Sequence, residues 1–211
     1  MPSKKKLCQN WKLYVITDRE ALQYGTLAEV VAAALDGGAD VIQLRDKKAA
    51  DKELVETAGA LLKITRPRGV PLIINDRVEV AKASGADGLH LGQGDGSLQA
   101  ARLALGPDVI IGRSTHSEDE ALKAEQDGFD YIGVGPVFPT PTKPSYSPVG
   151  LALVRFAASN LKVPFVAIGG IGLQNIAEVR LAGAHTVAVV RAVMASAHPR
   201  EAVMTLRRNL L

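Results

Sequence analysis

The chain has 211 residues, 47% hydrophobic and 22% charged, which is enough for one domain with a sizeable core. Its net charge is only +3, and its basic residues lack the clustered footprint of nucleic-acid-binding proteins. No apolar run approaches the ~18 residues of a membrane span, and the N-terminus lacks the apolar segment of a signal peptide. The single cysteine, Cys8, cannot form an intrachain disulfide. We therefore expect one cytoplasmic domain over residues 1–211, with a loose tail at 1–11.

Short apolar runs alternate with segments of helical periodicity along the chain. The apolar runs predict strands at 13–17, 40–45, 72–75, 88–92, 109–112, 131–137, 165–168 and 186–190. The periodic segments predict helices at 26–37, 52–68, 78–84, 98–105, 118–126, 151–159, 175–182 and 199–207.

The strand sequences favour a parallel sheet, because several are continuous apolar runs of the kind buried on both faces. Eight strand-helix units in about 200 residues predict a single (β/α)8 barrel, or TIM barrel. A doubly wound open sheet is the alternative. That fold usually has fewer strands, and no Gly-x-Gly-x-x-Gly fingerprint follows the first strand here.

Polar residues follow the predicted strands one after another. In such barrels the active site lies at the C-terminal ends of the strands. The residues at those ends, in chain order, are Gln43, Arg45, Lys47, Asn75, Asp76, Gln93, Asp95, Ser114, His116, Thr140, Thr142, Lys143, Gly169, Gly170, Val190 and Arg191. Alternation along the second strand places Gln43, Arg45 and Lys47 on one face.

These side chains have a chemistry suited to phosphates. The hydroxyls of Thr140 and Thr142 and the ammonium group of Lys143 can all donate to phosphate oxygens. Asp76 and Asp95 would repel each other unless a cation lay between them, and Mg²⁺ is typically held by one or two carboxylates plus substrate phosphates. The pattern predicts a magnesium-diphosphate site beside a second phosphate site.

Simpler explanations compete with this one. Arg45 and Asp76 would also suit a structural salt bridge between neighbouring strands, and the segment around Thr140 would suit a solvated loop. We expect His116 at a helix start or behind the site rather than acting as a base. We expect a structural role for His90, since its parity is opposite to that of Gln93.

Six motifs in order closely resemble thiamine phosphate synthase, over residues 13 to about 194. They are Gln43-x-Arg45-x-Lys47, Ile74-Asn75-Asp76-Arg77, His90-Leu-Gly-Gln93-x-Asp95, Gly112-x-Ser114, Gly135-Pro-Val-Phe-Pro-Thr-x-Thr-Lys143 and Ala167-Ile-Gly-Gly170-Ile171. The resemblance implies a transferase. It would join 4-amino-2-methyl-5-(diphosphooxymethyl)pyrimidine to 4-methyl-5-(2-phosphoethyl)thiazole or its carboxylate form. The products would be thiamine phosphate and diphosphate, with CO₂ from the carboxylate form.

The resemblance also implies roles for individual residues in a dissociative, Mg²⁺-assisted reaction. The pyrimidine diphosphate would be contacted by Gln43, Arg45, Lys47, Asn75, Ser114 and Lys143, of which Arg45, Lys47, Ser114 and Lys143 would be catalytic. Asp76 and Asp95 would bind Mg²⁺. The thiazole phosphate would be held by Thr140, Thr142 and Gly170, with Val190 and Arg191 closing the site.

Two positions depart from the family pattern. Arg191 replaces a small residue, most often serine, and Gly94 replaces a commonly acidic one. One rival is a paralogous thiazole tautomerase, which lacks the aspartate pair and the full Thr-x-Thr-Lys loop that are present here. The other is a non-catalytic sensor of thiamine intermediates, which would be marked by lost metal or diphosphate ligands. The sequence leaves the oligomeric state open.

Overall fold

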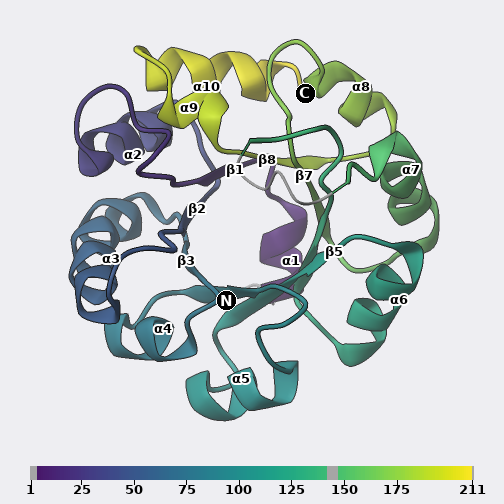
Figure 1. Cartoon of the computed structure of the whole chain (residues 1–211), viewed down its shortest axis with the longest axis horizontal. Helices are drawn as coiled ribbons and strands as arrows, with labels where there is room; N and C mark the ends of the chain where they lie inside the picture. Colours follow the sequence, from purple (N-terminus) through teal and green to yellow (C-terminus); the bar gives the residue numbers. More distant parts are fainter. Residues whose placement is uncertain (1–3, 142–146, 211) are drawn as a thin grey trace.

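The computed structural model describes residues 4–141 and 147–210 and shows a closed barrel of eight parallel strands. Neighbours in the barrel are neighbours in the chain, from β1 through β8 and back to β1, with helices forming an outer ring (Figure 1). The predicted single (β/α)8 barrel is therefore confirmed. The strands are β1 Leu13–Ile16, β2 Val41–Leu44, β3 Leu72–Asn75, β4 Gly88–Leu91, β5 Ile110–Thr115, β6 Tyr131–Val134, β7 Phe165–Ile168 and β8 Thr186–Val189.

Helices follow the strands in the expected alternation, with one further helix before β1 and two helices after β8. They are α1 Lys4–Gln9, α2 Leu27–Asp36, α3 Asp51–Thr65 with the 3₁₀ turn η1 Arg66–Arg68, α4 Val78–Ser84, α5 Leu98–Leu105, α6 Glu118–Asp127, α7 Gly150–Asn160, α8 Ile176–Leu181, α9 Arg191–Met194 and α10 Pro199–Arg208. Side-chain caps fix several helix starts. At α2, Thr26 accepts from the Glu29 backbone while the Glu29 carboxylate accepts from the Thr26 backbone.

The strands are buried on both faces, which explains their continuous apolar sequences. In β1, Leu13 and Val15 pack outward against the helices, and Tyr14 and Ile16 belong to the cluster inside the barrel. The same division runs around the barrel, so each strand contributes to two apolar layers.

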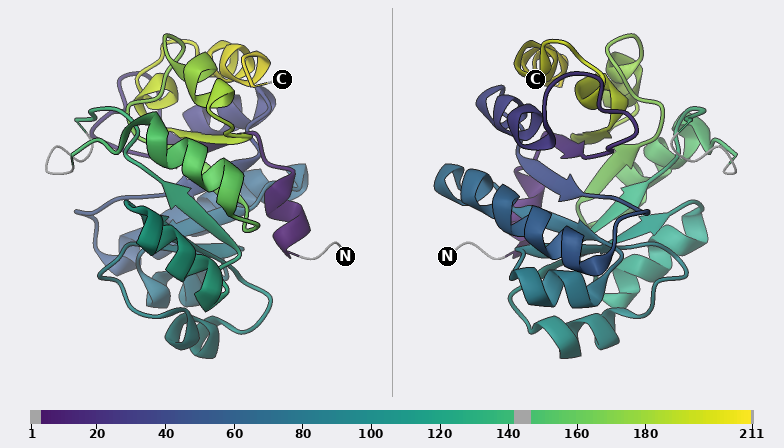
Figure 2. Two further views of the ribbon diagram at one scale, coloured as in Figure 1. Left: turned by 90° about the vertical axis from the view of Figure 1, so that its right-hand side faces the viewer. Right: turned by 60° about the vertical axis from the view of Figure 1, so that its left-hand side comes forward.

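The N-terminal segment differs from the expected loose tail. Residues 4–9 form α1, which lies across the end of the barrel where the strands begin (Figures 1 and 2). Cys8 and Trp11 are only 1% and 3% exposed and join the interior cluster. The prediction of a loose tail was wrong for residues 4–11. The run of lysines at 4–6 indicated a solvated segment, and nothing in the local sequence showed that Cys8 and Trp11 would be buried.

A repeated carboxylate joins neighbouring strands at the same end of the barrel. The sequence Gly-x-Asp precedes β2, β4 and β6, and each aspartate accepts a backbone N–H from the start of the preceding strand. The bonds are Leu13 to Asp40 at 2.9 Å, Leu72 to Asp87 at 2.9 Å and Ile111 to Asp130 at 2.7 Å. An arginine contacts each carboxylate: Arg207, Arg66 and Arg102 respectively. The three carboxylates thereby accept from backbone N–H groups at the strand starts, which the hydrogen bonds between the strands do not satisfy.

Two strand ends differ from the predictions by more than one residue, and one helix besides α1 was not predicted. Strand β5 continues to Thr115, because Ser114 and Thr115 still pair with Gly133 and Val134 of β6. Strand β6 ends at Val134, because the Val137 backbone turns to donate to Ile168 of β7 at 2.8 Å. The four-residue helix α9 was not predicted, since one helical turn is too short to show a period.

Candidate functional site

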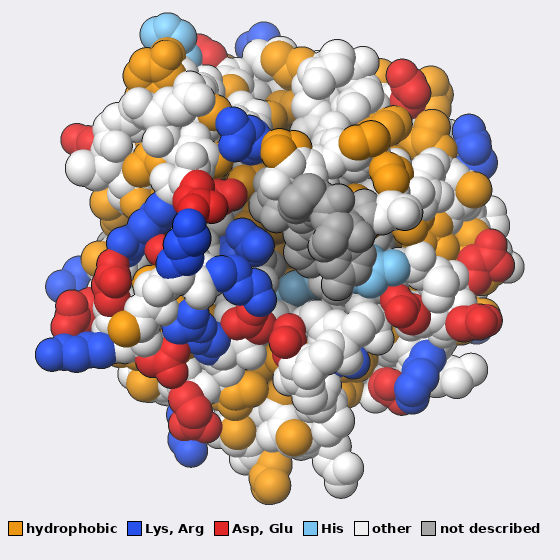
Figure 3. Space-filling view, in the orientation of Figure 1, with side chains coloured by type: hydrophobic (Ala, Val, Ile, Leu, Met, Phe, Trp, Pro, Cys, Tyr) orange, Lys and Arg blue, Asp and Glu red, His pale blue; other side chains and the backbone are white. Residues whose placement is uncertain are grey.

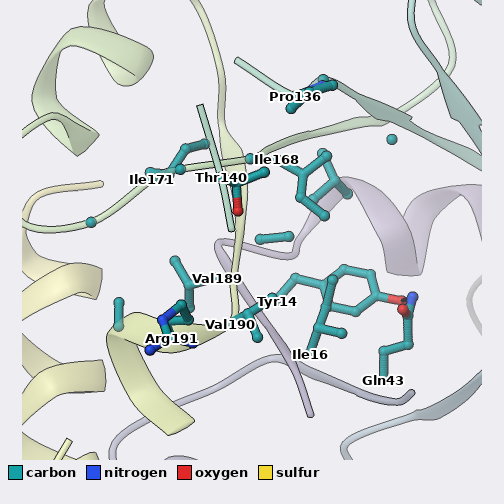
Figure 4. Close-up of a pocket in the computed structure, with 18 of the residues that line it drawn as sticks. Tyr14, Ile16, Gln43, Pro136, Thr140, Ile168, Ile171, Val189, Val190 and Arg191 are labelled. Carbon is teal, nitrogen blue, oxygen red and sulfur yellow. Dashed lines mark hydrogen bonds between the residues drawn. The ribbon is translucent and has the colours of Figure 1, made fainter. Parts of the chain in front are cut away.

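A cavity of about 570 Å³ opens at the C-terminal ends of the strands. Its walls come from every strand or from the loop that follows it. Figure 4 labels lining residues from β1, β2, β8 and the segments around β7. Eight residues predicted for substrate binding line it: Gln43, Arg45, Asn75, Ser114, Thr140, Gly170, Val190 and Arg191. The structure thus brings together side chains that lie up to 148 residues apart in the chain, from Gln43 to Arg191. Thr142 and Lys143 lie outside the described residues.

A smaller cavity of about 150 Å³ adjoins the first and is rich in charge. It is lined by Asp18, Arg19, Glu20, Arg45, Asp46, Lys47, Lys48, Pro141 and Arg191. Figure 3 shows Lys and Arg side chains interleaved with Asp and Glu on the side of this face where α2 and α3 lie. Arg45 and Arg191 border both cavities.

Most cations around the smaller cavity have carboxylate partners. Arg19 pairs with Asp46 at 3.2 Å, and Lys48 contacts Glu20. Within the described part of the chain, the side chains of Arg45 and Arg191 form no ion pair. Two guanidinium groups without a carboxylate partner border the same space, which favours an anion between them.

The two predicted metal ligands have different surroundings. Asp76 has a positive φ of 53°, a strained conformation for a residue with a side chain, and its carboxylate contacts Lys47. Asp95 is exposed and accepts from the Gly92 backbone at 2.7 Å. In residues 4–141 and 147–210 no group of three or more His, Cys, Asp or Glu is placed to hold a metal. Two carboxylates suit Mg²⁺, which completes its shell with water and substrate phosphates.

The cavity floor contains a chain of hydrogen bonds that the sequence did not suggest. Gln43 Nε2 donates to the Tyr14 hydroxyl at 2.9 Å (Figure 4). The Tyr14 and Tyr131 hydroxyls are 2.9 Å apart, and the Tyr131 hydroxyl is 2.9 Å from His90 Nδ1. His90 Nε2 is in turn 2.9 Å from Ser114 Oγ. Burial raises the pKa of both tyrosines further above the ordinary value of 10.0, at which a tyrosine hydroxyl is already protonated at neutral pH.

His90 therefore lines the cavity, which the parity argument failed to predict. That argument counted from Gln93, but β4 ends at Leu91 and alternation does not continue beyond it. Within the barrel His90 pairs with Asn75 of β3, and paired residues of parallel strands face the same side. The useful signal was a polar residue at an inward position of a strand, which also applies to Tyr14 and Tyr131.

His116 matches the expected place at a helix start. Its backbone N–H donates to Glu120 in the first turn of α6 at 2.7 Å, and its Nδ1 contacts the Gly135 carbonyl. It also lines the cavity. The ring thereby connects the end of β5 to the loop after β6.

The loop after β6 lies directly on the end of β7. The Phe138 N–H donates to the Gly169 carbonyl at 3.0 Å. Gly170 has a φ of +63°, and a Cβ there would lie 2.5 Å from the Pro139 carbonyl oxygen. Close approach of two backbones therefore requires glycine at this position and places Thr140 over the cavity.

Comparison with known proteins gives a consistent result. Residues 13–193 match the family model described as thiamine monophosphate synthase. The thiamine-phosphate synthase of Chloroflexus aurantiacus is 45% identical, with 94% of this chain and 92% of the relative covered. That of Shouchella clausii is 44% identical, with 93% and 94% covered.

The chain belongs to the thiamine monophosphate synthase family. A solved thiamine phosphate pyrophosphorylase from Pyrococcus furiosus has a TM-score of 0.88 at 41% identity, with 97% of each chain covered. The predicted resemblance is therefore confirmed, and the chain is an enzyme of the transferase class that this family comprises. No helix in the described parts is long and apolar enough to cross a membrane.

Proposed function

We propose that the chain joins the aminopyrimidine diphosphate to the thiazole phosphate, or to its carboxylate form, and releases diphosphate. The carboxylate form would also lose CO₂. The observation that carries the proposal is the position of Arg45 and Arg191 at the boundary of two adjoining cavities, where neither has a carboxylate partner among the residues that the structure describes. A substrate pair with two separate phosphate-bearing groups matches such a boundary.

The larger cavity suits the two rings. Its polar floor carries Gln43 and Ser114, which can exchange hydrogen bonds with an aminopyrimidine. Its wall near β7 and β8 is apolar, formed by Ile168, Ile171 and Val189 (Figure 4), and suits a thiazole ring. Thr140 lies on the same side and would contact the thiazole phosphate, together with the Gly170 backbone.

The remaining polar groups suit the diphosphate. Arg45, Lys47 and Asn75 would bind its oxygens, and Asp76 and Asp95 would hold Mg²⁺. The metal would supply positive charge to the leaving diphosphate. Thr142 and Lys143, outside the described residues, are proposed to contact the thiazole phosphate and the diphosphate respectively.

This reaction requires positioning and charge stabilisation more than a protein base or nucleophile. Departure of diphosphate leaves a pyrimidine-stabilised carbocation, and the thiazole nitrogen captures it. Arg45 and Lys47 stabilise charge that develops on the leaving group, so their effect is largest in the transition state. The cavity holds the two rings together, which removes the entropy cost of a bimolecular encounter.

Diphosphate release measured with both substrates, and with each alone, tests the proposal. We expect release to require both substrates, and Arg45→Ala to lower kcat/KM by about 10²–10³. Arg155→Ala, at an exposed position of α7, is the matched control and should have no effect. The proposed transfer would be refuted if the pyrimidine alone released diphosphate at the same rate, or if both substrates together released none.

A further inference from the structure

The hydrogen-bond chain on the cavity floor joins two residues that are distant in sequence. It runs from Gln43 of β2 through Tyr14, Tyr131 and His90 to Ser114 of β5, with 2.9 Å at every step. Both end residues line the cavity and are the proposed contacts of the pyrimidine. The three residues between them have no role in the function proposed above.

Two glycines leave space for the Tyr131 and His90 rings of the hydrogen-bond chain. A Cβ at Gly112 would lie 2.2 Å from the Tyr131 ring, which is far inside van der Waals contact. A Cβ at Gly133 would lie 3.4 Å from the His90 ring. Any larger residue at position 112 would displace the Tyr131 hydroxyl, so its location depends on the neighbouring strand.

The N-terminal segment packs against the two tyrosines of the hydrogen-bond chain. The Trp11 ring packs edge-on against Tyr14 and Tyr131, with centroid distances of 5.8 and 5.2 Å. Tyr14 and Tyr131 are only 2% and 1% exposed. Both rings therefore have little freedom to rotate their hydroxyls away from each other.

The available protons favour one direction along the chain. The Gln43 amide donates to Tyr14, so the Tyr14 hydroxyl is an acceptor on that side and can donate its own proton to Tyr131. Tyr131 then donates to His90 Nδ1, which leaves the His90 proton on Nε2, facing Ser114. The Ser114 hydroxyl accepts that bond and keeps its own O–H for another partner.

We propose that this chain sets the hydrogen-bond polarity with which the site recognises the pyrimidine. It holds Gln43 with its amide oxygen available as an acceptor and Ser114 with its hydroxyl available as a donor. A 4-aminopyrimidine offers the complementary pattern, an amino donor and ring-nitrogen acceptors. A 4-oxopyrimidine reverses it, with a carbonyl acceptor and a ring N–H donor. Tyr14, Tyr131 and His90 are thus positioning residues, and this inference rests on the proposed function.

Calorimetry of the full-length protein with the 4-amino and the 4-oxo pyrimidine diphosphates tests the proposal without relying on turnover. The wild type should prefer the amino compound at least about 100-fold, because the reversed pattern leaves buried polar groups unpaired. Tyr131→Phe keeps the ring and interrupts the chain. In Tyr131→Phe the affinity ratio of the amino over the oxo compound should fall at least about tenfold. His90 can then move its proton to Nδ1, and the Ser114 hydroxyl can donate to His90 and accept from the ligand.

Tyr24→Phe is the matched control, because Tyr24 is 52% exposed and is not one of the five residues joined by these hydrogen bonds. A folded Tyr131→Phe that keeps the full wild-type preference would overturn the proposal, whatever its thermal stability. Should Tyr131→Phe fail to fold, Tyr14→Phe interrupts the chain at the adjacent hydroxyl and is judged by the same ratio. If the wild type binds neither pyrimidine, the proposed function itself fails, and the inference with it.

Discussion

Lys47, after β2, and Asp76, at the end of β3, contact each other through their charged groups. One was predicted to bind diphosphate and the other Mg²⁺. A divalent cation at Asp76 would compete with Lys47 for the same carboxylate and release the ammonium group toward the phosphates. The pair therefore couples the proposed metal site to the proposed diphosphate site.

We expect Asp76→Asn to lower the Mg²⁺-dependent rate of diphosphate release by about 10²–10³. Asparagine tolerates the positive φ of 53° and so preserves the loop, while one anionic ligand is lost. Initial rates across a Mg²⁺ titration measure the effect. Asp51→Asn, which changes a nearby exposed carboxylate paired with Arg77, is the control. Wild-type rates in Asp76→Asn at equal Mg²⁺ would remove this residue from the metal site.

Arg191→Ser introduces the small residue that the family resemblance implied for this position. If the guanidinium binds the thiazole phosphate, affinity for that substrate should fall by about 1.5–3 kcal/mol, the scale of a charged hydrogen bond. Affinity for the pyrimidine diphosphate should barely change. Calorimetric titration of each ligand measures both effects, with Arg200→Ser at an exposed position of α10 as the control.

Because Arg191 borders both cavities, the same titration also shows which of the two phosphate-bearing substrates its guanidinium binds. A loss confined to the pyrimidine diphosphate would assign the guanidinium to the diphosphate beside Arg45. Unchanged affinity for both ligands would show that the side chain binds neither.

Gly170→Ala should strongly impair thiazole phosphate binding. The φ of +63° is unfavourable for alanine, and the new Cβ would lie 2.5 Å from the Pro139 carbonyl, so the loop carrying Thr140 must shift. We expect thiazole phosphate affinity to fall at least about tenfold, as for one lost hydrogen bond. Gly59→Ala, inside α3 with open space around it, should instead leave binding unchanged and stabilise the fold by about 0.5–1 kcal/mol. Equal binding by both variants would contradict the proposed loop contact.

Asp130→Ala should destabilise the barrel without changing the site. Its carboxylate accepts from the Ile111 backbone at 2.7 Å and contacts Arg102. The substitution would take this acceptor from the Ile111 N–H, while Arg102 would keep its contact with the Val109 carbonyl. Denaturant unfolding should show a loss of about 2–4 kcal/mol. The rate of the folded enzyme should be unchanged, since Asp130 lies where β6 begins. The exposed pair of Asp127 with Lys123 provides the control, with Asp127→Ala expected within about 0.5 kcal/mol of wild type.

The buried tyrosines predict how stability depends on pH. Burial raises the pKa of Tyr14 and Tyr131 above the ordinary value of 10.0. Above pH 10 the unfolded chain loses these protons while the folded protein retains them. The free energy of unfolding should therefore fall as pH rises, by about 1.4 kcal/mol per pH unit for each group. Tyr14→Phe should reduce this slope in unfolding measured between pH 9 and pH 11. An equal slope in both proteins would mean that Tyr14 is not kept neutral by burial.

The sequence by itself determined the barrel and the end of it that carries the site. Continuous apolar strands alternating with helical segments also suit a doubly wound sheet, but eight such units in about 200 residues favour the barrel, whose chain order places every strand's last residues together. Gln43, Arg45, Asn75, Ser114 and Thr140 were assigned from this rule, and all line the cavity. Local periodicity was enough to predict the strands and helices, because each kind of element has its own spacing of apolar residues.

Only the tertiary structure decided which polar groups are partners. The contact of Lys47 with Asp76, and the chain through Tyr14, Tyr131 and His90, join residues from different strands. These contacts join residues of separate strands, and the position of the Tyr131 ring also requires glycine at position 112 of the neighbouring strand. The burial of Trp11 beneath that chain was missed for the same reason. Periodicity within one segment reports which face is apolar, but the partner of a side chain is set by strands that meet only when the barrel closes.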